Sequence, residues 1–319
     1  MTTKLEREWP GLIALAALCA FLAIAAPRFY EPGNLRDLAL NNISVLLIAA
    51  GMTLIIIIGQ IDISVGSLFG VASVACGALA KIGVPLPVLP FAAVAIGSAF
   101  GAVNGALVSF VRAPSIVVTL ATMVAWREGL RWATGGAWVE GLPENFQWFG
   151  LGQQVGQLVI IGSALLLFAA LWWCSIHLSA LRAVYAMGSD ADAARLVGIP
   201  TKQVLFWVFV LLGSLTGIGS LLNGVRFSDV PANSGLNLEL EAIAAVVVGG
   251  TPITGGKGSL IGTFVGVLLL GSIAPALTFL GINPYWEKAI QGGIILVTVL
   301  LDAIRTHRIR RAGLKKAIA

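Results

Sequence analysis

Long apolar segments separated by short polar ones run through this chain from end to end. Segments long enough to cross a lipid bilayer, or nearly so, fall at residues 10–26, 38–58, 64–81, 88–111, 114–130, 155–176, 204–224, 238–250, 259–280 and 284–304. A spanning helix needs about 20 mostly apolar residues, because the hydrocarbon core is about 30 Å thick. The pattern predicts an all-α polytopic membrane protein, with about ten transmembrane helices in a single domain over residues 1–319.

Two of these segments have unusual lengths. In 114–130 the apolar run is cut short by Arg127 and Glu128, and in 238–250 it is confined between Glu241 and a pair of glycines. Short or interrupted segments in transporters often mark broken or re-entrant helices beside a translocation path. Ordinary tilted spans with charged ends would give the same pattern, so both interpretations stay open.

Charge and composition sharpen this picture. Only 11% of residues are charged, against about 25% in soluble domains. If the N-terminus is cytoplasmic, thirteen of the twenty Lys and Arg residues fall on the inner side, which predicts that both termini are cytoplasmic. The net charge of +5 therefore indicates membrane topology and not nucleic-acid binding. The tail, 305–319, holds Arg305, Arg308, Arg310, Arg311, Lys315 and Lys316.

The longest inner loop, residues 177–203, carries the signals of a short helix. Ser189 is a good N-cap, Asp190 and Asp192 suit a helix N-terminus, and Gly198 marks the end. A helix of roughly two turns needs a partner surface, either its own protein's inner face or a cytoplasmic subunit. The candidates for coupling to such a subunit are Ser189, Asp190, Ala193, Ala194, Arg195 and Gly198.

Polar side chains inside apolar segments are candidates for a substrate pathway, since they are costly in lipid. Asp62 could instead cap a helix that starts near Ser64, and Asn104 could bond a neighbouring helix. Glu239 and Glu241 also suit a helix N-terminus. The pathway candidates are Gln60, Asp62, Ser64, Asn104, Glu239 and Glu241.

A glycine-rich stretch, 249–259, invites comparison with a phosphate-binding loop. The comparison fails, because Thr251 and Gly258 stand where that motif needs Gly and Ser or Thr. Its glycines predict a tight, mobile connection instead, formed around Gly249, Gly250, Gly255 and Gly256. The three cysteines have no pairing or metal-ligand spacing. The sequence thus predicts no nucleotide site, catalytic group, cofactor or metal.

Several stretches together resemble bacterial ABC sugar-importer permeases of the ribose type, within the branched-chain-amino-acid-permease-like family. They are 51–54, 60–67, 104–105, 119–123, 184–199 and 241–258, and they run in family order between about residues 35 and 302. Gln60 departs from the usual glycine and Ser115 from a frequent proline.

The resemblance implies a non-enzymatic permease subunit in the bacterial inner membrane that brings a monosaccharide or similar polyol into the cell. It implies a second or sister permease, a cytoplasmic ATP-binding-cassette ATPase and a periplasmic sugar-binding protein as partners. ATP binding would close the ATPase, and the helix at 189–198 would relay that motion to the pore.

Two rival functions remain at this point. A permease for branched-chain amino acids or another small solute would favour more paired charges along the pore. A secondary transporter would need no ATPase and would move solute alone.

Overall fold

The computed structural model describes residues 2–298 and 300, with side chains from residue 9 onward. These residues form helices and loops, with one isolated β-bridge between Val139 and Val230. The α-helices are α1 (Thr2–Ala25), α2 (Pro32–Ile57), α3 (Val65–Lys81), α4 (Leu89–Ser109), α5 (Ser115–Thr134), α6 (Gln153–His177), α7 (Ser179–Ser189), α8 (Ala191–Leu196), α9 (Thr201–Gly224), α10 (Leu238–Val248), α11 (Leu260–Gly271) and α12 (Ile273–Phe279). Short 3-10 turns are η1 (Pro27–Tyr30), η2 (Leu86–Val88) and η3 (Gln147–Gly150), and residues 286–298 are also helical.

Helices cover the described part of every apolar segment that the sequence predicts. Five of the described helices are long and apolar enough to cross a membrane: Pro32–Ile57, Leu86–Ser109, Gln153–His177, Thr201–Gly224 and Leu260–Phe279. The end of the last predicted span and the basic tail, 305–319, lie outside the described residues.

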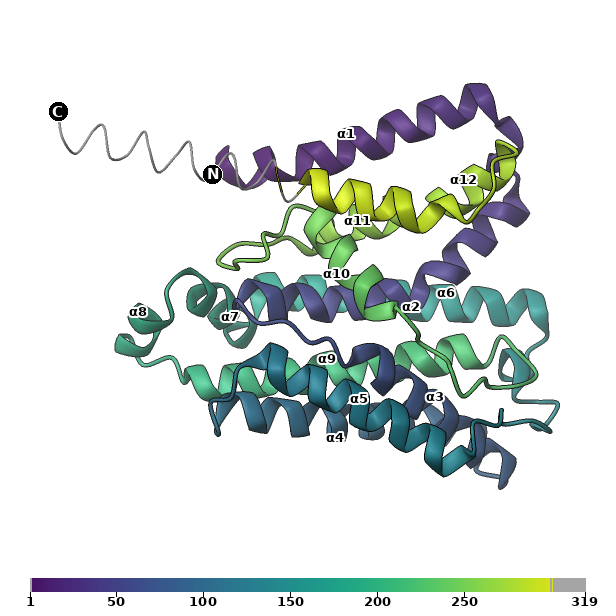
Figure 1. Ribbon diagram of the computed structural model, residues 1–319, viewed down its shortest axis with the longest axis horizontal. Coiled ribbons are helices and arrows are strands. Elements are labelled where there is room, and N and C mark those ends of the chain that lie inside the picture. Colours follow the sequence, from purple (N-terminus) through teal and green to yellow (C-terminus); the bar gives the residue numbers. More distant parts are fainter. Residues whose placement is uncertain (1, 299, 301–319) are drawn as a thin grey trace.

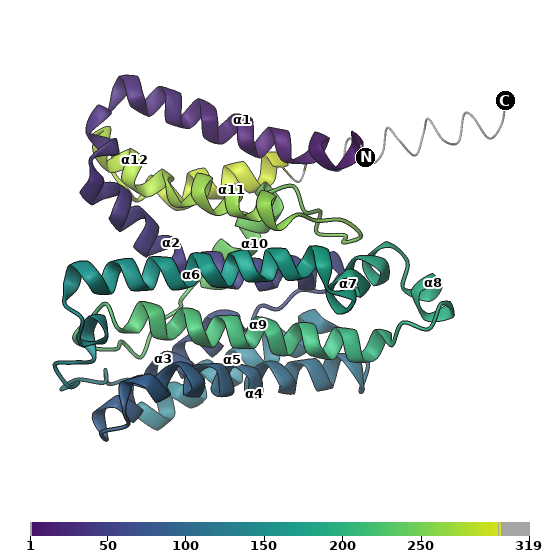
Figure 2. The ribbon, with the colours of Figure 1, turned by 180° about the vertical axis from the view of Figure 1, so that it is seen from behind.

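The helices lie in layers roughly parallel to the long axis of the molecule (Figure 1). α1 packs on α11 at one side, while α4 lies with α3 and α5 at the other. From behind, α6 and α9 lie between these two sides (Figure 2). α2 is the central helix, since 94% of its most apolar stretch is buried. A central helix must be apolar all round, and residues 43–58 of this chain satisfy that.

Small residues hold α4 and α9 at close range. A Cβ atom added to Gly97 would come within 2.1 Å of the Gly213 carbonyl oxygen, and one added to Gly217 within 2.0 Å of the Ala93 carbonyl oxygen. Glycine therefore lets the two backbones touch, which is how helices gain packing energy in lipid, where no hydrophobic force drives them together.

Two helices, α3 and α10, begin near the middle of the molecule and not at either end (Figure 1). α10 has 11 residues, or about 16 Å of helix, so it is too short to span a membrane core. The suspicion that 238–250 is a partial helix is thus confirmed. The same suspicion for 114–130 is wrong, because α5 runs unbroken through Arg127 and Glu128 to Thr134.

The two ends of the molecule differ. α7 and α8 lie at the end where α1 begins, while η1 and the start of α2 lie at the opposite end (Figure 1). α9 starts beside α8 and has 24 residues, so the loop that follows Gly224 returns at that opposite end. The coupling candidates therefore lie at the end that carries α7 and α8, while the pathway candidates at the starts of α3 and α10 lie nearer the middle of the molecule.

Candidate functional site

The turn between α2 and α3 is built around one glycine in the left-handed region. Gly59 has φ = 78°, and its N–H donates to the Ile56 carbonyl at 2.8 Å. Gln60 keeps a negative φ, and its N–H donates to the Ile55 carbonyl at 3.0 Å. The turn therefore needs only one glycine, so Gln60 is compatible with its geometry.

Three of the predicted pathway residues form one buried cluster at the start of α3. Asp62 accepts hydrogen bonds at Oδ1 from the backbone N–H (2.8 Å) and the hydroxyl (2.6 Å) of Ser64. Asn104, on α4, donates from Nδ2 to Ser64 Oγ at 2.8 Å and to Asp62 Oδ2 at 3.3 Å. All three side chains are almost fully buried. Asp62 thus bonds the residue before α3 and does not cap the helix, whose N-cap is Ser64, whereas Asn104 bonds across to a neighbouring segment as its structural alternative expects.

The start of α5 holds the same turn from another side. The Ile61 N–H donates to Ser115 Oγ at 3.4 Å, and Thr119 Oγ1 lies 3.5 Å from the Ile61 carbonyl oxygen. A proline at position 115 would have no hydroxyl to accept this bond. The departure at Ser115 therefore adds a polar contact between α5 and the turn.

Glu239 lies on the first turn of α10, as the sequence predicts. Its carboxylate packs against Gly66 at the first turn of α3, where an added Cβ would come within 2.1 Å of Oε2. Arg127 reaches the same region, since its Nη1 donates to the Ser234 carbonyl at 2.8 Å. Two helix N-termini, an acid and an arginine thus meet near the middle of the molecule, where a helix N-terminus favours negative charge.

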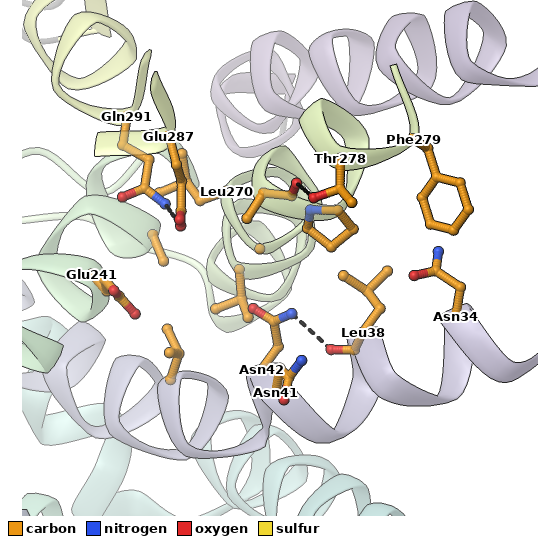
Figure 3. Close-up of a pocket in the computed structure, with 16 residues that line it drawn as sticks. Asn34, Leu38, Asn41, Asn42, Glu241, Leu270, Thr278, Phe279, Glu287 and Gln291 are labelled. Atoms are coloured by element: carbon orange, nitrogen blue, oxygen red, sulfur yellow. Dashed lines mark hydrogen bonds between the residues drawn. The ribbon is translucent and has the colours of Figure 1, made fainter. Parts of the chain in front are cut away.

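Glu241 faces elsewhere, into a cavity of about 390 Å³ between α2, α10, α11, α12 and the segment 286–298 (Figure 3). Its Oε1 lies 2.5 Å from Lys288 Nζ. Asn34, Asn41 and Asn42 line this cavity from α2, and Glu287 and Gln291 line it from the opposite side. Glu239 and Glu241 are therefore in different sites, although they are two residues apart.

The predicted coupling segment is two helices and not one. Ser189 is the last residue of α7, and the N-cap of α8 is Asp190, whose Oδ1 accepts from the backbone N–H groups of Asp192 (3.0 Å) and Ala193 (2.9 Å). The choice of Ser189 as N-cap was wrong because Ser189 is itself the last of the eleven helical residues of α7. Gly198, with φ = 87°, follows α8 as predicted.

The end of α8 exposes two apolar side chains, Leu196 on the helix and Val197 at its C-cap. Leu196 is 89% exposed and Val197 78%, whereas Ala194 is buried against the protein. Arg195 makes an exposed ion pair with Asp192 at 3.4 Å. A groove beside α8 reaches the α4–α5 connection and carries the side chains of Arg112 and Lys202. These features give this end of the molecule an open surface for a partner.

The glycine loop joins the coupling end to the turn after α2. The Gly256 N–H donates to the Ile57 carbonyl at 2.9 Å, and an added Cβ at Gly188 of α7 would approach that same oxygen within 2.2 Å. Gly250 and Gly255 have positive φ values, and Gly249 packs against Gly262 of α11. The predicted tightness is confirmed, while the predicted mobility stays a prediction.

Sequence reasoning did not single out Arg127 or the amides of α2. Asn41 and Asn42 lie inside a predicted span, so the rule that selected Asn104 would also have selected them. Among the described residues, no group of three or more His, Cys, Asp or Glu side chains is placed to hold a metal ion.

The family model described as branched-chain amino acid transport system / permease component matches residues 34–299. The chain belongs to this family. It is 35% identical over 299 residues to the ribose import permease protein RbsC of Escherichia coli (strain K12), covering 92% of this chain and 93% of that protein. It is 33% identical to the autoinducer 2 import system permease protein LsrC of Enterobacter sp. (strain 638), covering 98% and 90%. RbsC of Haemophilus influenzae is 31% identical over 92% and 93%. No solved structure matches this chain significantly.

Proposed function

We propose that this chain is the membrane-spanning permease subunit of an ATP-binding-cassette importer that brings a monosaccharide or similar small polyol into the cell. The observation that carries this proposal is the similarity, over nine-tenths of the chain, to import permeases for ribose and autoinducer 2. The proposed location is the bacterial inner membrane.

The proposed topology has ten membrane segments, of which α10 is a partial helix. α3 would also start inside the membrane, after the turn at Gly59. With α7 and α8 in the cytoplasm, the start of α1 lies on the same side, in agreement with the charge bias of the loops. The C-terminal tail would also be cytoplasmic.

Three protein partners complete the proposed machine. A cytoplasmic ATPase would cover the exposed apolar residues of α8, since Leu196 and Val197 otherwise face solvent. A periplasmic sugar-binding protein would dock at the opposite end. A second permease copy or a sister permease would complete the pore.

The contacts suggest how ATPase motion reaches the pore. α8 adjoins α7, and Gly188 of α7 packs on the last carbonyl groups of α2. The turn that follows α2 leads directly to Asp62 and the start of α3. A shift of α8 would therefore act on the end of α2 and on the Asp62–Ser64–Asn104 cluster. Helix shifts of this kind are a common switching device.

An exchange at Gly198 tests this coupling. In Gly198→Val, the side chain is forced to φ = 87°, which costs about 1–3 kcal/mol and displaces the end of α8. We expect sugar uptake by the reconstituted importer to fall several-fold while ATP hydrolysis continues. The matched control is Gly83→Val, at φ = 88° in the turn after α3 and away from α8. Normal uptake by Gly198→Val would contradict the coupling role.

The rival functions are separated by reconstitution. The complete importer should take up a labelled monosaccharide and not labelled leucine, and it should need ATP. Uptake by this chain alone, without an ATPase, would instead identify a secondary transporter. ATP-driven uptake of leucine would identify an amino-acid permease.

A further inference from the structure

The cavity that contains Glu241 lies within one copy of the chain, on the side of the molecule away from α8. Asn34 and Leu38 belong to the first turns of α2, at the end opposite α7 and α8 (Figures 1 and 3). Glu241 and Gln291 line its other side, near the middle of the molecule. In the proposed topology, the cavity extends from the outer face toward the middle of the membrane.

Amide groups make up much of its polar lining, and each is fixed by one bond to the protein. Asn34 Nδ2 donates to the Phe29 carbonyl at 2.6 Å, and Asn42 Nδ2 donates to the Leu38 carbonyl at 2.8 Å. Asn41 Oδ1 accepts from Arg226 Nη2 at 2.7 Å. The other polar atom of each amide has no hydrogen-bond partner among the described residues. Three oriented amides therefore offer two acceptors and one donor to a ligand.

The charged side chains at the cavity are Glu241, Glu287 and Lys288, which together carry one net negative charge. Lys288 Nζ lies 2.5 Å from Glu241 Oε1 and 3.9 Å from Glu287 Oε1. Glu287 also accepts a hydrogen bond at Oε1 from Gln291 Nε2 at 2.9 Å. Lys288 is thus occupied by the two acids, and no Lys or Arg is among the described residues that line the cavity, which disfavours the carboxylate of an amino acid.

Apolar surfaces complete the lining. Val45, Val267, Leu270 and Pro275 also line the cavity. The Phe279 ring stands beside Asn34 (Figure 3). The volume of about 390 Å³ falls in the lower part of the range for small-molecule sites, about 300–1,000 Å³. A polyhydroxyl ring, with hydroxyl groups at its edge and C–H groups on its faces, matches this mixture of surfaces.

We infer that this cavity, within one permease copy, is a binding subsite for a neutral polyhydroxyl solute, a pentose or hexose. The inference rests on the proposed function for its choice of ligand. Hydroxyl groups would donate to Asn34 Oδ1 and Asn42 Oδ1 and accept from Asn41 Nδ2. The site would hold the sugar weakly, because a carrier must also release it.

A thiol-protection experiment tests occupancy directly and needs no ATP. Thr278→Cys places a thiol at an exposed position of the cavity wall, in the purified permease–ATPase complex. We expect high concentrations of D-ribose or D-galactose to slow its reaction with a small polar maleimide several-fold, and L-leucine to have no effect. The matched control is Ser228→Cys, on an exposed loop outside the cavity, whose labelling no solute should change. The unmodified chain, with its three native cysteines, gives the background rate.

Transport supplies a second measurement. Asn42→Ala removes one acceptor, and we expect several-fold slower sugar uptake by the complete importer. Ser163→Ala, which removes a hydroxyl of α6 outside the cavity, should leave uptake unchanged. If neither sugar slows the labelling of Thr278→Cys in a complex that still imports sugar, the subsite is overturned and the proposed function stays intact. Equal protection by L-leucine would overturn the sugar class. An unmodified importer that moves no sugar would instead contradict the proposed function.

Discussion

Buried polar residues account for the local geometry around the start of α3. Asp62 would be very costly in an apolar interior without partners, and it has three hydrogen bonds, two from Ser64 and one from Asn104. In the sequence, Asp62, Ser64 and Asn104 already stand out as polar residues within apolar segments. That Asn104 donates to Asp62 across 42 residues of chain follows only from the way α4 packs against α3, and Asn104 Oδ1 is left buried without a partner among the described residues.

Removing the carboxylate of Asp62 should lower the stability of the folded protein. Asp62→Ala leaves Ser64 and Asn104 short of an acceptor, at about 1–3 kcal/mol per unsatisfied buried group. We expect a lower apparent melting temperature in detergent, followed by the fluorescence of the nine tryptophans. Asp229→Ala, whose carboxylate bonds only the adjacent Ser228 among the described residues, should melt normally. Unchanged melting with lost uptake would instead assign Asp62 to the substrate pathway.

Glycine positions decide how closely the helices approach one another. Gly97, Gly101 and Gly105 recur every four residues on α4, so they lie on one face of that helix, and this face meets α9 at Gly213 and Phe209. The repetition is visible in the sequence and predicts a close-packed face. The identity of the partner helix is not visible, because several other helices also carry glycines.

Filling this contact should separate the two helices. In Gly97→Val, the new side chain meets the backbone of Gly213, which cannot move aside as a flexible side chain would. Overpacking of this kind costs about 1–3 kcal/mol or more, so we expect poor yield and a lower melting temperature. Gly162→Val, on α6 with open space around it, provides the control and should purify like the unmodified protein. Equal behaviour of the two variants would show that α4 and α9 do not pack this closely.

The short helix α10 distinguishes this fold from a simple bundle of membrane-spanning helices. α10 is 11 residues long, and the chain of turns and bends before it runs beside α3, where Gly70 and Gly77 leave room for Ser234 and Val230. An irregular segment can lie at membrane depth only if protein covers its polar backbone groups. The glycines of α3 let this segment pack closely enough for α3 to cover it. Glu239 then lies against Gly66, on the first turn of α3.

At the scale of the whole molecule, the two ends have different chemistry. One end carries α8 and its groove with Arg112, Arg195 and Lys202, while the other carries η1, the loop after α9 and the entrance to the amide-lined cavity. This separation suits a permease that meets an ATPase on one side and a binding protein on the other.

The orientation can be measured in intact cells. We expect Ser228→Cys to react with a membrane-impermeant maleimide applied from outside, because the loop after α9 would face the periplasm. Asp192→Cys, on α8, should react only after the membrane is permeabilised. The chain with its native cysteines provides the background. The reverse pattern would contradict cytoplasmic termini.

The sequence by itself determined the class of protein, the positions of nearly all helices and the presence of the short helix α8. It could do so because apolar runs, caps and glycines act locally, within a few residues. It could not show that α5 is continuous, since charged residues at a helix end and a break in a helix leave the same pattern. It also could not separate Glu239 from Glu241, because only packing decides which of two neighbouring side chains faces α3 and which faces the cavity. The tertiary structure settled these points, since long-range contacts depend on which helices pack together.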